Sequence, residues 1–386
     1  MSQPGMKKIA IVRGKFLNRY EMQFFAPLVT RYDMTAFASL TPYHDRFAFP
    51  VVKLPSPMDI PDVPYKMSVL NRLFTDAHYL FGLEHALKGY DLVHTAETYF
   101  RYTQQCLDAK KRGYVQKVIA TVLENIPFNN EGIRGRKAYK QRARRELDHL
   151  IALTEKTKEA MIKEGTDPQK ITVIRHFIDT TRFAPDTTHL DRLSDPARRS
   201  FTIVYTGRLE AYKGVMDMLS AAELLSHDPA LSPYALTMRF VGTGSLAGAM
   251  TEKERQIGNG WHFEHTSATY DAMPDVYRDA DIFIAPSKPT PTWEEQYCTA
   301  LLEAQASALP IVTTVSGGIP ENVGSAAVLV PPGDVSAIAE ALKHYVLEPK
   351  KRRMFAERAR KRARAVHDIS IGAGKLAALY DRVLSG

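Results

Sequence analysis

Short apolar runs of the size of buried β-strands alternate with helix-like stretches along this chain, and the alternation occurs twice. Strands that alternate with helices form a parallel sheet covered by helices on both faces. The sequence therefore predicts an α/β fold with two Rossmann-like domains that face each other across a cleft. The predicted strands are 7–12, 91–94, 118–122 and 150–153 in the first half, and 201–205, 236–241, 281–285, 310–313 and 327–330 in the second.

A break in this pattern indicates where one domain ends and the next begins. Residues 183–199 are rich in Pro, Asp, Thr and Arg and are weakly periodic, so we predict a linker there. The N-terminal domain would comprise residues 1–182 and the C-terminal domain residues 200–365. A helix over 366–386 could then pack back on the first domain. A chain of 386 residues is long enough for two hydrophobic cores.

The charge of the chain narrows the classes of partner. Its net charge of +8 favours anionic partners. Much of the excess lies in two runs, Arg134 to Arg145 and Lys350 to Arg364. Such runs are usually solvated helix faces, and the alternative for the first run is an acceptor-binding patch or a peripheral membrane contact. Neither run is accompanied by RNA-binding aromatic motifs or zinc-finger spacing, so no nucleic-acid partner is expected.

The remaining composition favours a cytoplasmic protein, with peripheral attachment to a membrane surface as an alternative. No apolar run approaches the roughly 18 residues of a membrane span, and the start has no signal-peptide pattern. The two cysteines, Cys106 and Cys298, are far apart in sequence, which argues against a disulfide framework or a cysteine metal site.

One loop in the second half concentrates positive charge. Gly207-Arg208 and Lys213-Gly214 follow directly on the strand predicted at 201–205. In open α/β sheets, ligands bind beyond the carboxyl ends of the strands. Two cations beside glycines, which allow close backbone approach, indicate an anion-binding loop.

A second loop places two carboxylates around a predicted helix that begins at Cys298. Glu295 lies just before this helix and Glu303 lies in its second turn. Glu303 follows Glu295 by eight positions, which correspond to a rise of about 12 Å along a helix, roughly the length from a sugar to a ribose across a diphosphate. The helix N-terminus between them favours phosphate, so we predict a nucleoside diphosphate site here.

These motifs, in this order, resemble the retaining glycosyltransferases of family 4, which have the GT-B fold. The resemblance covers the second half almost throughout and the first half more loosely, through 91–94 and the loop at Gly14. The matching features are the paired glutamates, the Gly-Arg…Lys-Gly loop, Phe240–Gly244, Ser316–Glu321, and the segment from Val173 to Pro185.

The resemblance implies a role for each matching residue. Arg208 and Lys213 would hold the donor diphosphate and offset the charge of the departing nucleotide, so neither a metal nor a cofactor is expected. Glu295 would lie near the transferred sugar, and together with the two cations it forms the predicted catalytic set. Glu303 would bind the ribose. The predicted donor-binding residues are Gly14, Gly207, Arg208, Lys213, Gly242, Tyr277, Glu295, Tyr297, Cys298, Thr299 and Glu303.

The chain also departs from the family pattern. Cys298 stands where many members have glycine, and Ala96 stands where members often have a histidine. Cys298 is interpreted either as a thiol with a lowered pKa at a helix N-terminus or as a small filler. His94 is a candidate for either the core or the site. The acceptor-side candidates are His94, Glu97, Glu124 and Asn125, and no catalytic base is assigned.

The implied reaction moves a hexosyl unit from a nucleoside diphosphate sugar to a hydroxyl of a glycan, lipid-linked or small-molecule acceptor. It would proceed with retention of anomeric configuration and without a metal. One alternative is a catalytically degenerate nucleotide-sugar-binding protein of the same fold, which Ala96 and Cys298 motivate. The other is a GT-B epimerase or phosphorylase, although no lysine motif for pyridoxal phosphate is apparent.

Overall fold

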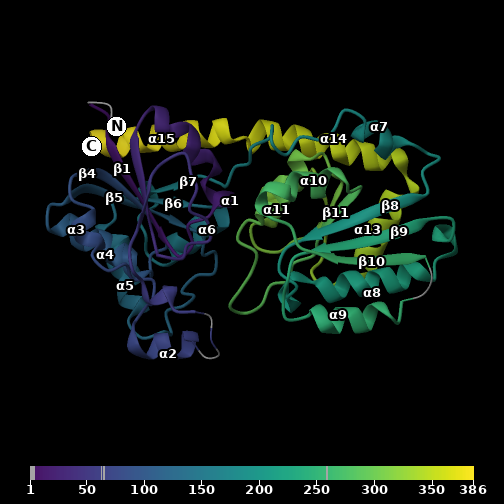
Figure 1. The fold of residues 1–386 in the computed structure, drawn as a ribbon, viewed down its shortest axis with the longest axis horizontal. Coiled ribbons are helices and arrows are strands. Elements are labelled where there is room, and N and C mark those ends of the chain that lie inside the picture. Colours follow the sequence, from purple (N-terminus) through teal and green to yellow (C-terminus); the bar gives the residue numbers. More distant parts are fainter. Residues whose placement is uncertain (1–4, 62, 64–65, 258–259) are drawn as a thin grey trace. The chain divides into compact units, whose positions relative to one another are not determined.

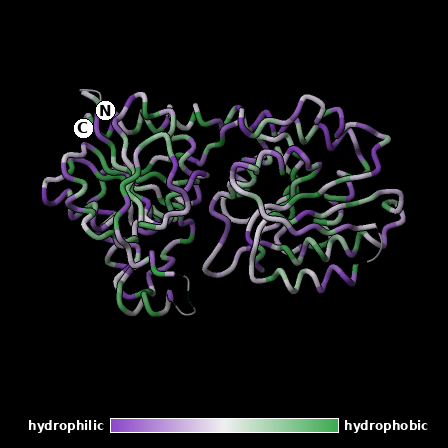
Figure 2. The backbone as a smooth tube through the Cα atoms, viewed as in Figure 1, coloured by the Kyte–Doolittle hydropathy of each residue, from purple (hydrophilic) through white to green (hydrophobic). Residues whose placement is uncertain are grey.

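A computed structural model describes residues 5–61, 63, 66–257 and 260–386. The chain forms two compact units (Figure 1). The first contains the chain up to Phe177 together with Ile369–Gly386, and the second contains Ile178–Asp368. In each unit the hydrophobic segments gather in the strands of the interior (Figure 2). Among the described residues, no helix combines the length and apolar character needed to cross a membrane.

The first unit is built on a seven-stranded sheet in the order β3-β2-β1-β4-β5-β6-β7, with parallel pairing throughout. Ile9 to Val12 of β1 have no exposed surface, as expected for a central strand between two helical layers. The strands are β1 (Lys8–Gly14), β2 (Asp33–Ala38), β3 (Val51–Lys53), β4 (Tyr90–Ala96), β5 (Val115–Val122), β6 (His149–Ala152) and β7 (Ile171–Val173). The helices are α1 (Arg19–Met22), η1 (Gln23–Thr30), η2 (Pro57–Asp59), α2 (Lys66–Leu73), α3 (Leu83–Ala86), α4 (Arg101–Lys111), α5 (Arg136–Glu146), α6 (Glu155–Lys163), η3 (Pro168–Lys170) and α15 (Ile369–Ser385).

The second unit is built on a six-stranded parallel sheet in the order β10-β9-β8-β11-β12-β13. Helices cover both faces: α8 packs against α13, and α11 packs against α14 (Figure 1). The strands are β8 (Ser200–Thr206), β9 (Ala235–Val241), β10 (Trp261–Thr266), β11 (Ile282–Ala285), β12 (Ile311–Thr314) and β13 (Val328–Val330). The helices are α7 (His189–Ser194), η4 (Ala211–Lys213), α8 (Val215–Ser226), η5 (Pro229–Leu231), α9 (Ala247–Glu254), η6 (Tyr270–Ala272), α10 (Met273–Arg278), α11 (Thr299–Ala306), α12 (Ile319–Val323), α13 (Val335–Leu347) and α14 (Pro349–Val366). The prediction of two α/β sheets is confirmed.

The segment 183–199, which the sequence predicts to be a linker, lies within the second unit. Phe183 has no exposed surface, and α7 packs on α14 through the buried Leu193. Most of the polar residues that suggested a linker lie before or after this short helix, where Asp186, Thr187, Thr188 and Asp195 are exposed. At the other end of the chain, α15 packs on η1 in the first unit, with Leu376 and Tyr380 fully buried.

The first basic run, on and before α5, is largely neutralised by ion pairs inside the first unit. Arg136 pairs with the fully buried Asp76 at 3.1 Å, and Lys140 and Arg144 both pair with Glu164. Arg142 likewise pairs with carboxylates on α4 and α5. The exposed cations that remain are Arg134, Lys137 and Arg145. That is fewer than the roughly four to eight of a typical lipid-binding cluster.

In the second basic run, on α14, Lys350, Arg358, Lys361 and Arg364 are exposed, whereas three arginines point inward. Arg352 donates to carbonyls at the end of α13, Arg360 to the carbonyl of Ala306 at the end of α11, and Arg362 to two carbonyls of α12. The last carbonyls of a helix have no partner within it and carry partial negative charge, so cations stabilise them. These arginines are therefore helix caps of the second unit, not members of a solvated face.

Candidate functional site

The topology of the second sheet places two loops next to each other. The order β10-β9-β8-β11-β12-β13 reverses direction between β8 and β11, which pair directly. In sheets of this kind, ligands bind beyond the carboxyl ends of the strands at the point of reversal. The loops that leave these two strands carry the predicted cations, Arg208 and Lys213, and the predicted carboxylate, Glu295.

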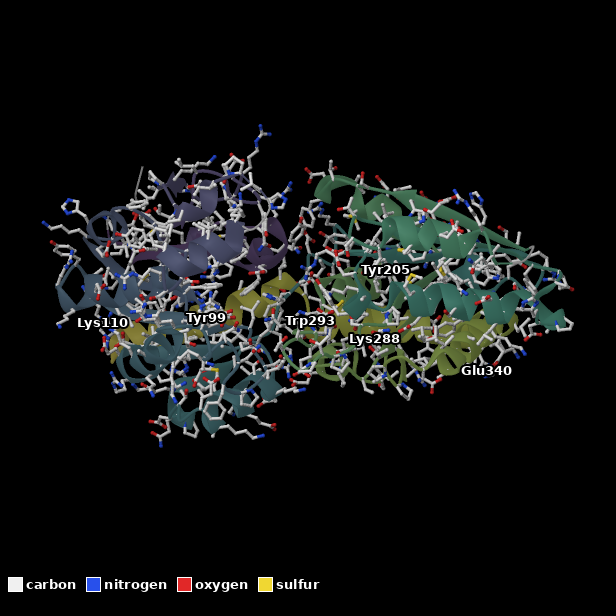
Figure 3. All side chains as sticks on the ribbon, turned by 90° about the horizontal axis from the view of Figure 1, so that it is seen from below. Tyr99, Lys110, Tyr205, Lys288, Trp293 and Glu340 are labelled. Atoms are coloured by element: carbon white, nitrogen blue, oxygen red, sulfur yellow. The ribbon has the colours of Figure 1, made fainter. Side chains whose placement is uncertain are left out.

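Lys213 and Glu295 are in direct contact. The Nζ atom of Lys213 lies 2.6 Å from Oε2 of Glu295, and the hydroxyl of Ser287 donates to the same oxygen at 2.8 Å. Both charged side chains are mostly shielded from solvent, with exposed fractions of 15% and 9%. The Lys213 ammonium also lies 4.8 Å from the ring centroid of Trp293, which is labelled in Figure 3. These contacts fix the position of a cation that has little freedom to move.

The side chain of Arg208 is exposed, but the backbone of its loop is fixed by a hydrogen bond. The hydroxyl of Tyr205, on β8 (Figure 3), donates to the carbonyl of Arg208 at 2.7 Å. The Arg208 guanidinium lies 5.3 Å from the ring centroid of Tyr212, which is within cation–π range. Arg208 therefore presents a charge at the surface of the site from a backbone that is held in place.

Close backbone contacts join the loops of the site. A Cβ atom on Gly317 would lie 1.8 Å from the carbonyl oxygen of Glu295, so only glycine fits there, and the N–H of Gly318 donates to that oxygen at 2.8 Å. Gly207 and Gly242 are in contact in the same way, since a Cβ on Gly242 would lie 2.0 Å from the Gly207 carbonyl oxygen. The Ser316–Glu321 and Phe240–Gly244 segments thus support the two charged loops.

The tip of α11 brings together three predicted donor-binding residues. Tyr297 is buried, Cys298 is the N-cap and Thr299 is the first helical residue. Cys298 has φ 55° and ψ 82°, a left-handed conformation that glycine adopts far more readily than cysteine. The idea of a thiol with a lowered pKa is wrong, because burial and the nearby Glu295 raise the pKa of Cys298 to about 12. The cost of burying a thiolate at this position exceeds the stabilisation that the helix dipole would give it.

At the other end of the α11 segment, Glu303 is held by Tyr277. The Tyr277 hydroxyl donates to Oε2 of Glu303 at 2.6 Å and lies 2.8 Å from the hydroxyl of Thr206. Desolvation raises the pKa of Glu303 to about 7. Tyr277 has no exposed surface, and its hydroxyl contacts the carboxylate that is predicted to bind the ribose.

The first sheet reverses direction in the same manner, between β1 and β4. Gly14 ends β1 and packs on the ring of Tyr102, and His94 lies within β4. The His94 ring is buried and lies 2.7 Å from both the Tyr380 and the Thr121 hydroxyls. Burial and Arg13 lower the pKa of His94 well below its ordinary value. These contacts fit the core interpretation of this histidine.

The acceptor-side carboxylates lie just beyond β4 and β5. Glu97 is buried with φ 57°, and its Oε1 accepts from the N–H of Leu123 at 2.9 Å. Within the described part of the chain, its Oε2 has no hydrogen-bond partner. Burial raises the pKa of Glu97 to about 8 and also raises that of Glu124, which accepts bonds from Ile126 and Asn129. Asn125 is buried beside them.

Some site residues were not predicted from the sequence. Ser287 and Trp293 contact the predicted charges Glu295 and Lys213, and Thr206 contacts the hydroxyl of Tyr277. The only available signal was their position at or just after predicted strands, which many structural residues share.

Two family models match most of the chain. The model described as Glycosyltransferase Family 4 matches residues 28–182, and the model described as Glycosyl transferases group 1 matches residues 200–347. The chain belongs to glycosyltransferase family 4. The family resemblance and the fold class predicted from the sequence are thereby confirmed.

Individual relatives agree with this family assignment. D-inositol 3-phosphate glycosyltransferase from Rhodococcus opacus (strain B4) is 29% identical over 214 residues, which covers 53% of this chain and 46% of that protein. The match thus spans about half of the relative. Among solved structures, Anabaena HepE in complex with UDP superposes with a TM-score of 0.74 at 16% identity, covering 98% of this chain and 100% of that one. Sucrose-phosphate synthase from Thermosynechococcus elongatus gives a TM-score of 0.74 at 18% identity, covering 98% and 99%. These two structures support the GT-B fold.

Proposed function

We propose that this family 4 member is a hexosyltransferase that moves a sugar from a nucleoside diphosphate to an acceptor hydroxyl with retention of configuration and without a protein-bound metal. The observation that carries the proposal is the contact between Lys213 and Glu295 at the reversal point of the second sheet, beside the tip of α11. UDP in the HepE complex supports a nucleotide donor.

The proposed roles follow from charge and position. Arg208 and Lys213 stabilise the diphosphate as the bond from the sugar C1 to the phosphate oxygen breaks. The acceptor oxygen forms its bond to C1 on the same face, and its proton passes to the departing phosphate oxygen. Glu295 orients Lys213 and contacts the sugar, and Glu303 accepts hydrogen bonds from the ribose. Fixed cations that act where negative charge develops contribute strongly to catalysis.

A catalytically degenerate binding protein is the second candidate, because Cys298 adopts a left-handed conformation where many members have glycine. Such a protein would bind the nucleotide sugar without releasing nucleoside diphosphate. The two candidates therefore differ in one measurable product.

The test incubates the protein with UDP-, GDP- and ADP-sugars and a panel of acceptors that includes inositol 3-phosphate, because of the relative's name. Release of nucleoside diphosphate that depends on acceptor and survives EDTA, with retained anomeric configuration by NMR, supports the proposal. Binding without release favours the degenerate protein. Replacing Arg208 and Lys213 by alanine should lower kcat by at least 10²-fold, by analogy with oxyanion donors. Lys288→Ala removes a cation that instead pairs with Asp217 at 2.9 Å, and it should have little effect.

A further inference from the structure

Asn322, on α12, contacts the loop that would bind phosphate. It has no exposed surface, and its Nδ2 donates to the carbonyl oxygen of Tyr297 and, at 3.1 Å, to that of Cys298. One side chain thus holds two consecutive peptide groups at the N-terminus of α11. The family motifs in the sequence did not single out this residue.

The direction of these carbonyls determines the direction of the neighbouring amides. The chain has no cis peptide among its described residues, and in a planar trans peptide the C=O and the following N–H point in opposite directions. Because Asn322 holds the carbonyls of Tyr297 and Cys298, the N–H groups of Cys298 and Thr299 point away from it. Among the described residues, neither N–H donates to a protein acceptor. Successive N–H groups in alternating left- and right-handed conformation form an anion-binding concavity.

Asn322 also compensates for the cysteine at position 298, where many family members have glycine. Glycine adopts a left-handed conformation without steric cost, whereas cysteine at φ 55° does not. The two hydrogen bonds from Asn322 act on the carbonyls on either side of this residue. They therefore hold the conformation that glycine would adopt unaided.

Asn322 is itself fixed by its surroundings. Its Oδ1 accepts from Gln305 at 2.8 Å. Its backbone carbonyl accepts from Arg362 at 2.7 Å and lies 2.9 Å from Nε2 of His367. Arg362 belongs to the basic run on α14, so part of that run acts on the site through α12.

We propose that Asn322 is a positioning residue, which turns the N–H groups of Cys298 and Thr299 toward the donor diphosphate and compensates for the absence of glycine at position 298. The inference rests on the proposed function, because it requires a nucleoside diphosphate at the tip of α11. It assigns no catalytic step to Asn322 itself.

The test compares a nucleoside diphosphate with its own nucleoside. Among UDP, GDP and ADP, the one that most raises the melting temperature of the full chain is used as the probe. Asn322→Leu keeps the approximate shape and removes the donors, and Asn322→Ala serves if that variant unfolds. The diphosphate affinity should fall about 10- to 100-fold, the range for hydrogen bonds to charged groups, whereas nucleoside affinity should stay within about twofold.

Two further variants separate positioning from general destabilisation. Val323→Ala weakens the same helix at a fully buried position and should leave the ratio of the two affinities unchanged. Cys298→Gly in the Asn322→Leu background should recover part of the diphosphate affinity. An unchanged ratio in both Asn322 variants, with wild-type protein that binds the diphosphate, overturns the inference. Wild-type protein that binds no nucleoside diphosphate overturns the proposed function, and this inference with it.

Discussion

Replacing Tyr277 by Phe should move the pH dependence of donor use to higher pH. Glu303 can accept hydrogen bonds from a ribose fully only when it is ionised, and burial raises its pKa to about 7. The 2.6 Å hydrogen bond from Tyr277 favours the ionised form. Removing this hydroxyl therefore raises the pKa of Glu303 further.

The size of the effect follows from the buried geometry. A hydrogen bond to a charged group contributes about 1.5–3 kcal/mol, and 1.36 kcal/mol corresponds to one pH unit in a pKa. The midpoint of kcat/KM for the donor should thus rise from about 7 in the wild-type protein by about one to two pH units in Tyr277→Phe. At pH 7 the variant should show a roughly 10-fold lower kcat/KM, and most of the loss should disappear above pH 9.

The assay is an initial-rate series over donor concentration between pH 6 and pH 9.5, at saturating acceptor. Glu303→Gln provides the control, because it removes the titrating group and should abolish this midpoint. A rate loss in Tyr277→Phe that is equal at every pH would refute the reasoning. A midpoint that persists in Glu303→Gln would show that another group, such as Glu97, governs the profile.

Stability offers an independent measure of the same carboxyl group. The folded protein keeps the Glu303 proton up to about pH 7, whereas the unfolded chain loses it near 4.5. The folded state binds more protons in this window, so its stability falls as the pH rises from 4.5 to 7 and then stays level. The difference between the two pKa values corresponds to about 3 kcal/mol. Between pH 4 and pH 8, the free energy of unfolding of the wild-type protein should therefore fall by about 3 kcal/mol relative to that of Glu303→Gln.

Two further predictions concern packing. Arg136→Met leaves Asp76 buried without the arginine and should lower the free energy of unfolding by about 3 kcal/mol in urea denaturation. The control Lys137→Met, at an exposed position on α5, should change the free energy of unfolding by less than about 0.5 kcal/mol. Equal effects of the two substitutions would contradict the importance of the buried ion pair. Gly317→Ala places a Cβ against the Glu295 carbonyl and should lower the melting temperature and raise the donor KM. The control Gly248→Ala, with open space around it on α9, should instead stabilise the folded protein by about 0.5–1 kcal/mol. An unchanged donor KM in Gly317→Ala would contradict the importance of the loop contact.

The charged residues of the candidate site could be predicted to lie near one another because their sequence signals are local. Arg208 and Lys213 follow directly on a strand, and Glu295 and Glu303 flank a helix N-terminus, so a short stretch of sequence contains each motif. The parallel order of the strands then brings the two loops together without further information. The sequence did not predict how Tyr277 meets Glu303, because 26 residues and a strand separate them.

The basic runs show why the remaining features were not predictable. Arg136 meets Asp76 across 60 residues, and Arg362 meets α12 across about 40 residues. The sequence shows that a cation is present, but it does not show which carbonyl or carboxylate the cation contacts in the folded chain. The segment 183–199 illustrates the same limit, because Phe183 and Leu193 are buried by partners distant in sequence.

The two sheets present chemically different groups at equivalent places. At the reversal point of the second sheet, Arg208 and Lys213 carry permanent charge. Near the reversal point of the first, burial raises the pKa of Glu97 to about 8 and lowers that of His94 well below its ordinary value, so both are neutral near pH 7. A neutral carboxyl group both donates and accepts hydrogen bonds, as a hydroxyl ligand requires. In the proposed reaction, charge therefore lies where a diphosphate would bind, and the neutral Glu97 lies among the predicted acceptor-side residues. Cations are visible in a sequence, whereas a protonation state set by burial is not, so the sequence indicates the charges of the second sheet but not the neutral state of Glu97.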